Sequence, residues 1–123
     1  MIKQALIEGF RKSASMKREK DGIRVFKNDL ITDFDYDKTD NKLQLTSTVI
    51  SEDLYNQYSV KLDIDTINKE LLFTHCSCDD FEKYRDRNNT YCCKHIIATF
   101  YKFIDLLDVD PSVKVQLGLD EKK

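Results

Sequence analysis

The chain has 123 residues, a length that suits one domain with a hydrophobic core of its own. Its apolar fraction of 41% argues against a disordered chain, and no apolar run reaches the roughly 20 residues that a membrane-spanning helix needs. The net charge of −2 argues against a protein that attracts nucleic acid through its overall charge, although residues 1–28 carry eight basic and only three acidic residues.

The first ten residues do not resemble a secretion signal. Glu8 interrupts their apolar stretch, and no cleavage site of small residues follows. We therefore expect a cytoplasmic protein whose cysteine thiols stay reduced.

The chain opens with a predicted helix over residues 2–19. Leu6 and Phe10 belong to an apolar series with spacings of three and four residues, and basic residues lie between its members. Asp21-Gly22 then interrupts this series, as such pairs do in turns. The apolar residues at 23–26 predict a short strand after the turn.

Three further segments alternate between apolar and polar residues, which is typical of strands with one buried face: residues 30–37, 43–50 and 58–64. Residues 70–75 follow a turn and are predicted to form a last strand. Short polar stretches join them, so we expect an antiparallel meander of four to five strands. The first segment is predicted to bury a face made of four residues: Leu30, Thr32, Phe34 and Tyr36.

After these strands the pattern changes to that of helices. Asp79 can cap a short helix that runs through Tyr84 or Arg85, and acidic residues in its first turn favour this N-terminus. A polar loop at 86–91 follows. Apolar residues at helical spacing then predict an amphipathic helix over residues 94–107.

The predicted fold class is α+β, in one compact domain over residues 1–107. Residues 108–123 would form a tail or a linker. The parts of the domain are an N-terminal helix (1–21), an antiparallel sheet (22–75) and a strand-loop-helix segment (76–107).

All four cysteines lie between residues 76 and 93. Cys76 and Cys78 form one pair with a single residue between them, and Cys93 and His95 form a second pair with the same spacing. Two close ligand pairs separated by a loop are the usual layout of a structural zinc site. Three thiolates and one imidazole fill the tetrahedral shell of Zn²⁺, at about 2.3 Å from sulfur and 2.0–2.1 Å from nitrogen. A closed shell leaves no water to activate, so we expect one structural zinc ion.

The two ligand pairs are predicted to join a strand to a helix. Residues i and i+2 of a strand point to the same side, so Cys76 and Cys78 can converge on one ion. The N-terminus of the 94–107 helix carries a partial positive charge that favours the Cys93 thiolate. Binding of the metal would therefore contribute to folding of this half of the chain.

Two neighbouring residues compete for the ligand roles. Cys92 stands beside Cys93, and His75 stands beside Cys76. In an extended segment neighbours point in opposite directions, so only one member of each pair faces the ion. We favour Cys93, because it repeats the one-residue spacing of the first pair, and His95, because the apolar helix follows it directly.

Other roles for the cysteines are weaker. They can pack as small core residues, whereas disulfides have no support without a secretion signal and no C-x-x-C redox motif is present. A reactive thiol at Cys92 or Cys93 would need His95 as its base, and a base two residues away is poorly placed.

The cysteine segment resembles the SWIM zinc finger. The resemblance rests on CSCDDFEKY at 76–84 and on CKHIIA at 93–98, which opens a helix. It covers residues 71–104 closely, and residues 22–70 look like the region upstream of the finger in bacterial Swi/Snf-type helicases. The doubled cysteine departs from the family pattern, which usually has one cysteine there. The chain has no G-x-x-x-x-G-K-[ST] loop, so we expect no ATP hydrolysis by this chain itself.

The resemblance implies a role in binding DNA or another nucleic acid, or in binding proteins. The basic residues predicted to contact phosphates around the finger are Lys83, Arg85, Arg87 and Lys94, with Lys12, Lys17 and Arg18 joining them if the first helix lies nearby. Tyr84 and Tyr91 are candidates for stacking on unpaired bases.

The alternative is a protein-interaction module that docks on a helicase motor or another partner. An acidic strand face at Asp33, Asp35 and Asp37 suits that role. An enzyme is not expected, because no nucleophile with a base and no open metal site can be identified.

Overall fold

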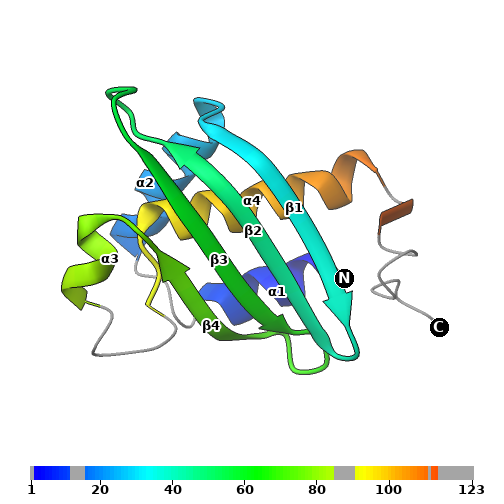
Figure 1. The fold of residues 1–123 in the computed structure, drawn as a ribbon. Coiled ribbons are helices and arrows are strands. Elements are labelled where there is room, and N and C mark those ends of the chain that lie inside the picture. Colours follow the sequence, from blue (N-terminus) through cyan, green and yellow to red (C-terminus); the bar gives the residue numbers. More distant parts are fainter. Residues whose placement is uncertain (1, 12–15, 85–90, 111, 114–123) are drawn as a thin grey trace.

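The computed structural model describes residues 2–11, 16–84, 91–110 and 112–113. Its helices are α1 (Ile2–Arg11), α2 (Met16–Lys27), α3 (Asp79–Tyr84) and α4 (Lys94–Val109). Its strands are β1 (Ile31–Thr39), β2 (Lys42–Ile50), β3 (Gln57–Asp65) and β4 (Glu70–Cys76). They form one antiparallel sheet in the order β1-β2-β3-β4 (Figure 1). The predicted α+β fold with an antiparallel meander is therefore confirmed.

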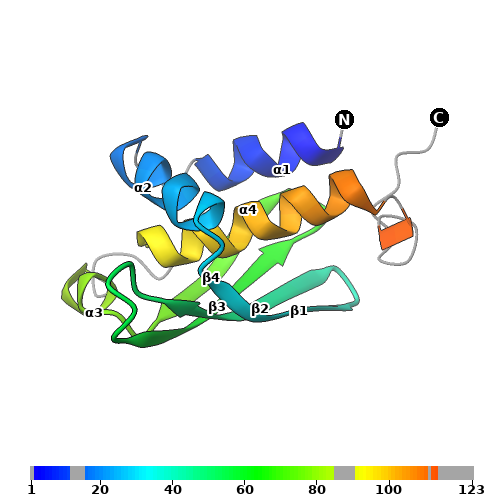
Figure 2. The same cartoon turned by 90° about the horizontal axis from the view of Figure 1, so that it is seen from above.

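The elements lie in layers. Figure 2 shows α4 across one face of the sheet and α2 packed on α4. The helix α1 lies against α4 and also against the β3–β4 end of the sheet, where Gly9 approaches the backbone of Lys69. The core fills the space between these layers, and Leu45, Leu62 and Phe103 are fully buried in it. The rings of Phe10 and Phe100 stack with centroids 4.0 Å apart, which fixes α1 against α4.

The predicted strand at residues 23–26 is wrong. These residues belong to α2, and Gly22 lies inside that helix and not in a turn. A Cβ atom on Gly22 would lie 2.4 Å from Cγ2 of Ile97 and 3.0 Å from the carbonyl oxygen of Lys94. The glycine therefore permits a close approach of α2 to α4, and Val25 is fully buried in the same contact. The single helix predicted over residues 2–19 is replaced by α1 and α2, and residues 12–15 lie outside the described residues.

A bulge in β1 corrects the predicted buried face of that strand. Ile31 is buried and Thr32 is exposed, the reverse of the predicted alternation, whereas Phe34 and Tyr36 are half-buried as expected. The pairing with β2 shifts between Thr32 and Asp35, and Asp33 has a φ of 50°. The extra residue in β1 inverts the phase of the strand at this point.

The remaining elements agree with the predicted ones to within a few residues. The sheet starts at Ile31 and not at residue 22, and α4 runs two residues beyond the predicted end at 107. Of the predicted polar loop at 86–91, only Tyr91 is among the described residues. No helix in the described part of the chain is long and apolar enough to span a membrane.

Candidate metal centre

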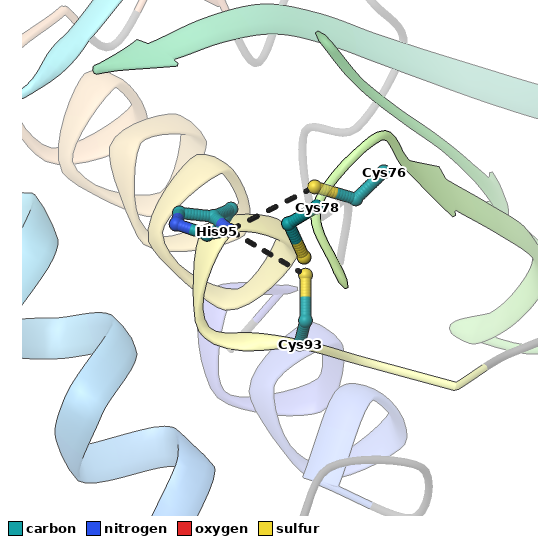
Figure 3. A group of neighbouring side chains, drawn as sticks. All are labelled: Cys76, Cys78, Cys93 and His95. Carbon is teal, nitrogen blue, oxygen red and sulfur yellow. Dashed lines mark hydrogen bonds between the residues drawn. The ribbon is translucent and has the colours of Figure 1, made fainter. Parts of the chain in front are cut away.

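Four side chains from the end of β4 and the start of α4 converge on one point, as Figure 3 shows. They are Cys76, Cys78, Cys93 and His95. Their candidate ligand atoms all lie within 4.8 Å of one another, and all four residues are buried. The structure thus brings together the four residues whose spacing predicts a zinc site.

The first ligand pair is positioned by the end of the sheet. Cys76 closes β4 opposite Val60 of β3. The intervening Ser77 continues the pairing, because its N–H donates to the carbonyl of Ser59 (3.1 Å) and its Oγ accepts the N–H of Ser59 (2.9 Å). Ser77 is exposed, so Cys76 and Cys78 on either side of it turn inward. The N–H of Phe81 in α3 donates to Cys78 Sγ at 3.4 Å.

The second ligand pair sits at the N-terminus of α4. Cys93 is the N-cap residue in an extended conformation (φ −81°, ψ 171°), and its carbonyl accepts the N–H of Ile97 at 3.1 Å. His95 directs Nδ1 at the sulfurs, 3.8 Å from Cys76 Sγ and 3.9 Å from Cys93 Sγ (Figure 3). The helix N-terminus favours negative charge on these thiols.

His95 is held in place from two sides. Its ring packs against that of Tyr58, with centroids 4.6 Å apart. Its carbonyl accepts the hydroxyl of Thr99 (3.0 Å), and Thr99 in turn shares a hydrogen bond with Ser47 of β2 (2.7 Å). These contacts fix the first turn of α4 on the sheet, so the imidazole has little freedom to leave the group.

The donor set and its spacing fit zinc. Ligands bonded at about 2.0–2.3 Å in a tetrahedron lie roughly 3.3–3.8 Å apart. The distances from Nδ1 of His95 to the sulfurs of Cys76 and Cys93 come within a few tenths of an ångström of this range. Three sulfurs and one nitrogen complete the shell, so the arrangement suits a structural ion.

The sulfur atoms strongly affect each other's pKa. Hydrogen bonds from Cys76 and then Cys93 hold the pKa of Cys78 well below its usual range. Donation to Cys78 raises the pKa of Cys76 to about 12, and burial raises the pKa of Cys93 well above its usual value. One thiolate therefore forms readily, whereas three together require a positive charge among them. A divalent cation supplies that charge.

Cys92 stands apart from this group. It is 1% exposed, and burial raises the pKa of its thiol to about 12. The structure thus places Cys93, the favoured residue, among the ligand atoms and leaves Cys92 in the core. His75 is half-buried and stands edge-on to Phe81 (5.5 Å), away from the four ligand atoms.

A pocket of about 350 Å³ opens beside the metal centre. It is lined by residues of α2, β3, α3, α4 and the metal group: Lys17, Arg18, Asp21, Tyr58, Cys78, Asp79, Asp80, Lys94 and His95. Two of its cations are engaged in ion pairs, one within the pocket and one outside it. Arg18 donates two hydrogen bonds to Asp80 (3.1 and 3.2 Å), and Lys94 binds Glu52 (2.8 Å).

The structure places the predicted nucleic-acid contacts only in part. Lys94 borders the pocket and Lys83 is exposed on α3, whereas Arg85 and Arg87 lie outside the described residues. Lys17 and Arg18 do lie near the finger, because both border the same pocket, but they belong to α2 and not to the first helix. Lys12 and the side chain of Tyr84 also fall outside the description.

Tyr91 is less available for stacking than its sequence position suggests. Its hydroxyl donates to Asp80 (2.9 Å), and the guanidinium of Arg18 covers its ring at 5.2 Å. The link between Arg18 and Asp80, 62 residues apart, cannot be predicted from the sequence, because no local pattern indicates so distant a pair.

Comparison with known proteins identifies the segment that holds this centre. Residues 58–104 match the family model of the SWIM zinc finger. No curated protein and no solved structure matches the chain. The matched segment includes all of β3 except Gln57, the whole of β4 and α3, and most of α4, and therefore all four ligand residues. Residues 58–104 thus match the SWIM zinc finger, and the group of three cysteines and one histidine within them can hold a zinc ion.

Proposed function

We propose that this chain is a non-catalytic nucleic-acid-binding module, with zinc as its structural ion, that serves as an accessory to a Swi/Snf-type helicase motor. The observation that carries the proposal is a row of exposed basic residues on α2, next to the finger. Lys17, Lys20, Arg24 and Lys27 lie at spacings of three, four and three residues, so they share one face of the helix. All four are exposed. We call this row the α2 basic stripe.

The stripe faces outward because the opposite side of α2 is buried. Gly22 and Val25 pack against α4, the helix that also carries His95. The metal centre fixes the start of α4, and α4 in turn supports α2. The zinc ion is therefore proposed to act indirectly, by holding the support on which the stripe is displayed.

Most of the stripe is available to an anionic partner. Within the described ranges, Lys17, Lys20 and Lys27 make no ion pair, whereas Arg24 pairs with Glu52 and Asp21. Ten residues separate the first lysine from the last, which corresponds to about 15 Å along a helix. This length suits contact with several successive phosphates of one strand.

A salt titration of a labelled oligonucleotide tests the proposal. We expect the affinity to fall steeply with salt, and the triple substitution Lys17→Gln, Lys20→Gln and Lys27→Gln to reduce the slope of log K against log salt by about 2 on a single strand. The matched control removes the same charge elsewhere, with Lys38→Gln, Lys42→Gln and Lys61→Gln on the sheet. A salt-insensitive titration of the unmodified protein would rule out the proposed function.

Docking on a protein partner is the second candidate, and the open face of the sheet favours it. In the described chain no helix covers this face, on which exposed Asp35 and Asp37 pair with Thr46 and Gln44. Opposite charges on a partner such as a helicase motor would complement it. Charge reversal of Asp35 and Asp37 should then abolish co-purification with the motor fragment. An unchanged complex would eliminate this candidate.

A further inference from the structure

The loop between β2 and β3 displays two large side chains to solvent at the end of the molecule that carries the metal centre. Tyr55 is 88% exposed, more than any other large apolar or aromatic side chain in the described ranges. Leu54 is 68% exposed, and only Tyr55 and Val109 exceed it there. Exposure of this degree contributes almost nothing to the core. Tyrosine is enriched at binding interfaces, where its ring supplies apolar area and its hydroxyl a polar end.

Hydrogen bonds hold this loop in one conformation. The N–H of Ser51 donates to the carbonyl of Asn56 (2.9 Å), and the N–H of Leu54 donates to the carbonyl of Ser51 (2.8 Å). The carboxylate of Asp53 accepts the N–H of Tyr55 (3.0 Å) and the hydroxyl of Ser51. Tyr55 is therefore displayed by an ordered loop, and little conformational entropy is lost when its ring meets a ligand.

Leu54 adopts a conformation that its side chain disfavours. Its φ is 69°, in the left-handed region, where glycine or asparagine is usual and a branched apolar residue is rare. A folded chain keeps such a residue only where the surrounding contacts impose it. Glycine would adopt this backbone conformation at a lower energetic cost, so folding alone does not explain a bulky apolar side chain at this position.

Glu52 anchors the loop beside the α2 basic stripe. Its carboxylate accepts hydrogen bonds from Arg24 of the stripe (2.8 and 3.1 Å) and from Lys94 at the start of α4 (2.8 Å). Figures 1 and 2 show the loop, α2 and the start of α4 together at one end of the molecule. The loop that carries Tyr55 is thereby bonded to the helix that carries the basic stripe.

We propose that this end of the molecule binds single-stranded nucleic acid, with Tyr55 stacked on an unpaired base and the α2 basic stripe on the phosphates. The inference rests on the proposed function and names its substrate class. Stacking on exposed aromatic rings beside a basic surface is how proteins hold single strands without reading their sequence. A duplex offers its phosphates but not its base faces, so it cannot use Tyr55 in this way.

Binding of a short labelled oligothymidylate and of a mixed-sequence duplex of the same length tests this inference. We expect the single strand to bind more tightly, and Tyr55→Ala to weaken it by about 5- to 150-fold, the range for one lost base–aromatic stack. Tyr55→Phe keeps the ring and should bind as the unmodified protein does. Neither substitution should change duplex binding.

The matched control is Ile67→Ala. Ile67 is 64% exposed and lies in the β3–β4 turn, at the opposite end of the sheet. This variant should bind both probes normally. Zinc content and circular dichroism, measured on every variant, show that the fold is intact.

The outcomes separate the two proposals. Salt-dependent binding that is unchanged in Tyr55→Ala, or that favours the duplex, overturns the single-strand inference and leaves the proposed function standing. Absence of salt-dependent binding to either probe overturns both. Loss of a protein partner in Tyr55→Ala, with oligonucleotide binding intact, assigns the loop to protein docking and also overturns the inference.

Discussion

Two adjacent cysteines of this chain have different surroundings. The N-cap of α4 is extended, so Cys92 and Cys93 point in opposite directions. Cys93 enters the group of ligand atoms, while Cys92 is buried in the core. The extended backbone at Cys93 thereby determines which of the two cysteines faces the metal centre and which packs in the core.

Substitution of each cysteine tests this distinction. Cys92→Ser should retain one zinc ion per chain and lower the free energy of unfolding by about 1–3 kcal/mol, because a hydroxyl replaces a buried thiol. Cys93→Ser should lose the zinc ion under chelator competition, because only three ligands remain. Metal analysis of both purified variants provides the measurement. The reverse result, with zinc lost from Cys92→Ser alone, would mean that the ligand is Cys92.

At the scale of single residues, sequence spacing predicts what is local. Two ligand pairs with one residue between the members of each were enough to predict the group. The contact of Arg18 with Asp80 and the left-handed backbone of Leu54 could not be predicted, because each depends on segments distant in sequence or on a closed loop.

Among the elements, the contact between α2 and α4 depends on a residue without a side chain. Gly22→Ala would place a Cβ within 3 Å of Ile97 and should lower the free energy of unfolding by about 1–3 kcal/mol through overpacking. Urea denaturation monitored by circular dichroism measures this loss. Ile97→Ala removes the Cγ2 atom at 2.4 Å and leaves the Cβ atom at 2.6 Å, so it relieves part of the clash. The loss of stability in the double variant should therefore be smaller than the sum of the two single losses.

Gly9→Ala is the control for the double variant of Gly22 and Ile97. Its Cβ would lie 1.5 Å from the carbonyl oxygen of Lys69, which is backbone and cannot be trimmed by substitution. No rescue by Ile97→Ala is expected in this variant. Losses of Gly22→Ala and Ile97→Ala that are strictly additive in the double variant would contradict the close contact of α2 with α4.

Glu52 joins three elements and should make stability depend on pH. Hydrogen bonds from Arg24 and then Lys94 lower the pKa of Glu52 to about 2, from a usual value of 4.5. Because the pKa is lower in the folded state, the contribution of Glu52 is complete above about pH 4.5 and is lost as the pH falls toward 2.

The stability difference between the unmodified protein and Glu52→Gln should therefore be largest near about pH 7 and shrink toward about pH 3. Urea unfolding across this range measures it, with zinc content determined for each sample so that only samples of equal occupancy are compared. A difference that grows as the pH falls would show that the Glu52 contacts do not stabilise the fold.

At this scale, regular alternation predicted three of the four strands correctly, because an antiparallel strand with one buried face alternates between apolar and polar residues. The strand at residues 70–75 was predicted correctly from its place after a turn. The prediction of a strand at residues 23–26 failed because these apolar residues suit a strand as well as a helix, and because Asp21-Gly22 is a pair that often forms a turn. Only the packing of α2 on α4 decides between the two states, and that packing is a property of the tertiary structure. The β1 bulge at Asp33 could not be predicted either, because it depends on how β1 pairs with β2 in the folded sheet.

For the whole molecule, the metal centre connects the end of the sheet to the helix on which α1 and α2 rest. Apparent binding energies of structural zinc, about 10–16 kcal/mol, are comparable with the entire stability of a small domain. We expect chelation to lower the free energy of unfolding by roughly 5 kcal/mol or more. Denaturation with and without a chelator measures this loss.

Re-addition of zinc should restore the original unfolding midpoint. Acidification should release the ion as well, because protons displace zinc from thiolates. A protein that unfolds at the same denaturant concentration with and without the metal would show that the ion does not hold the fold together.

The order of the elements along the chain has a consequence for biosynthesis. The strands pair with their immediate neighbours, so the sheet can assemble as it leaves the ribosome. The helix α2 packs on α4 and must wait for it, and α4 ends 82 residues after Lys27. At 5–20 residues per second, this delay is roughly 4–16 s. During that interval Val25 lacks its partner in α4, and Phe10 of α1 lacks the ring of Phe100. The nascent chain is therefore most exposed to misassociation, and most in need of a chaperone, before its metal ligands have been synthesised.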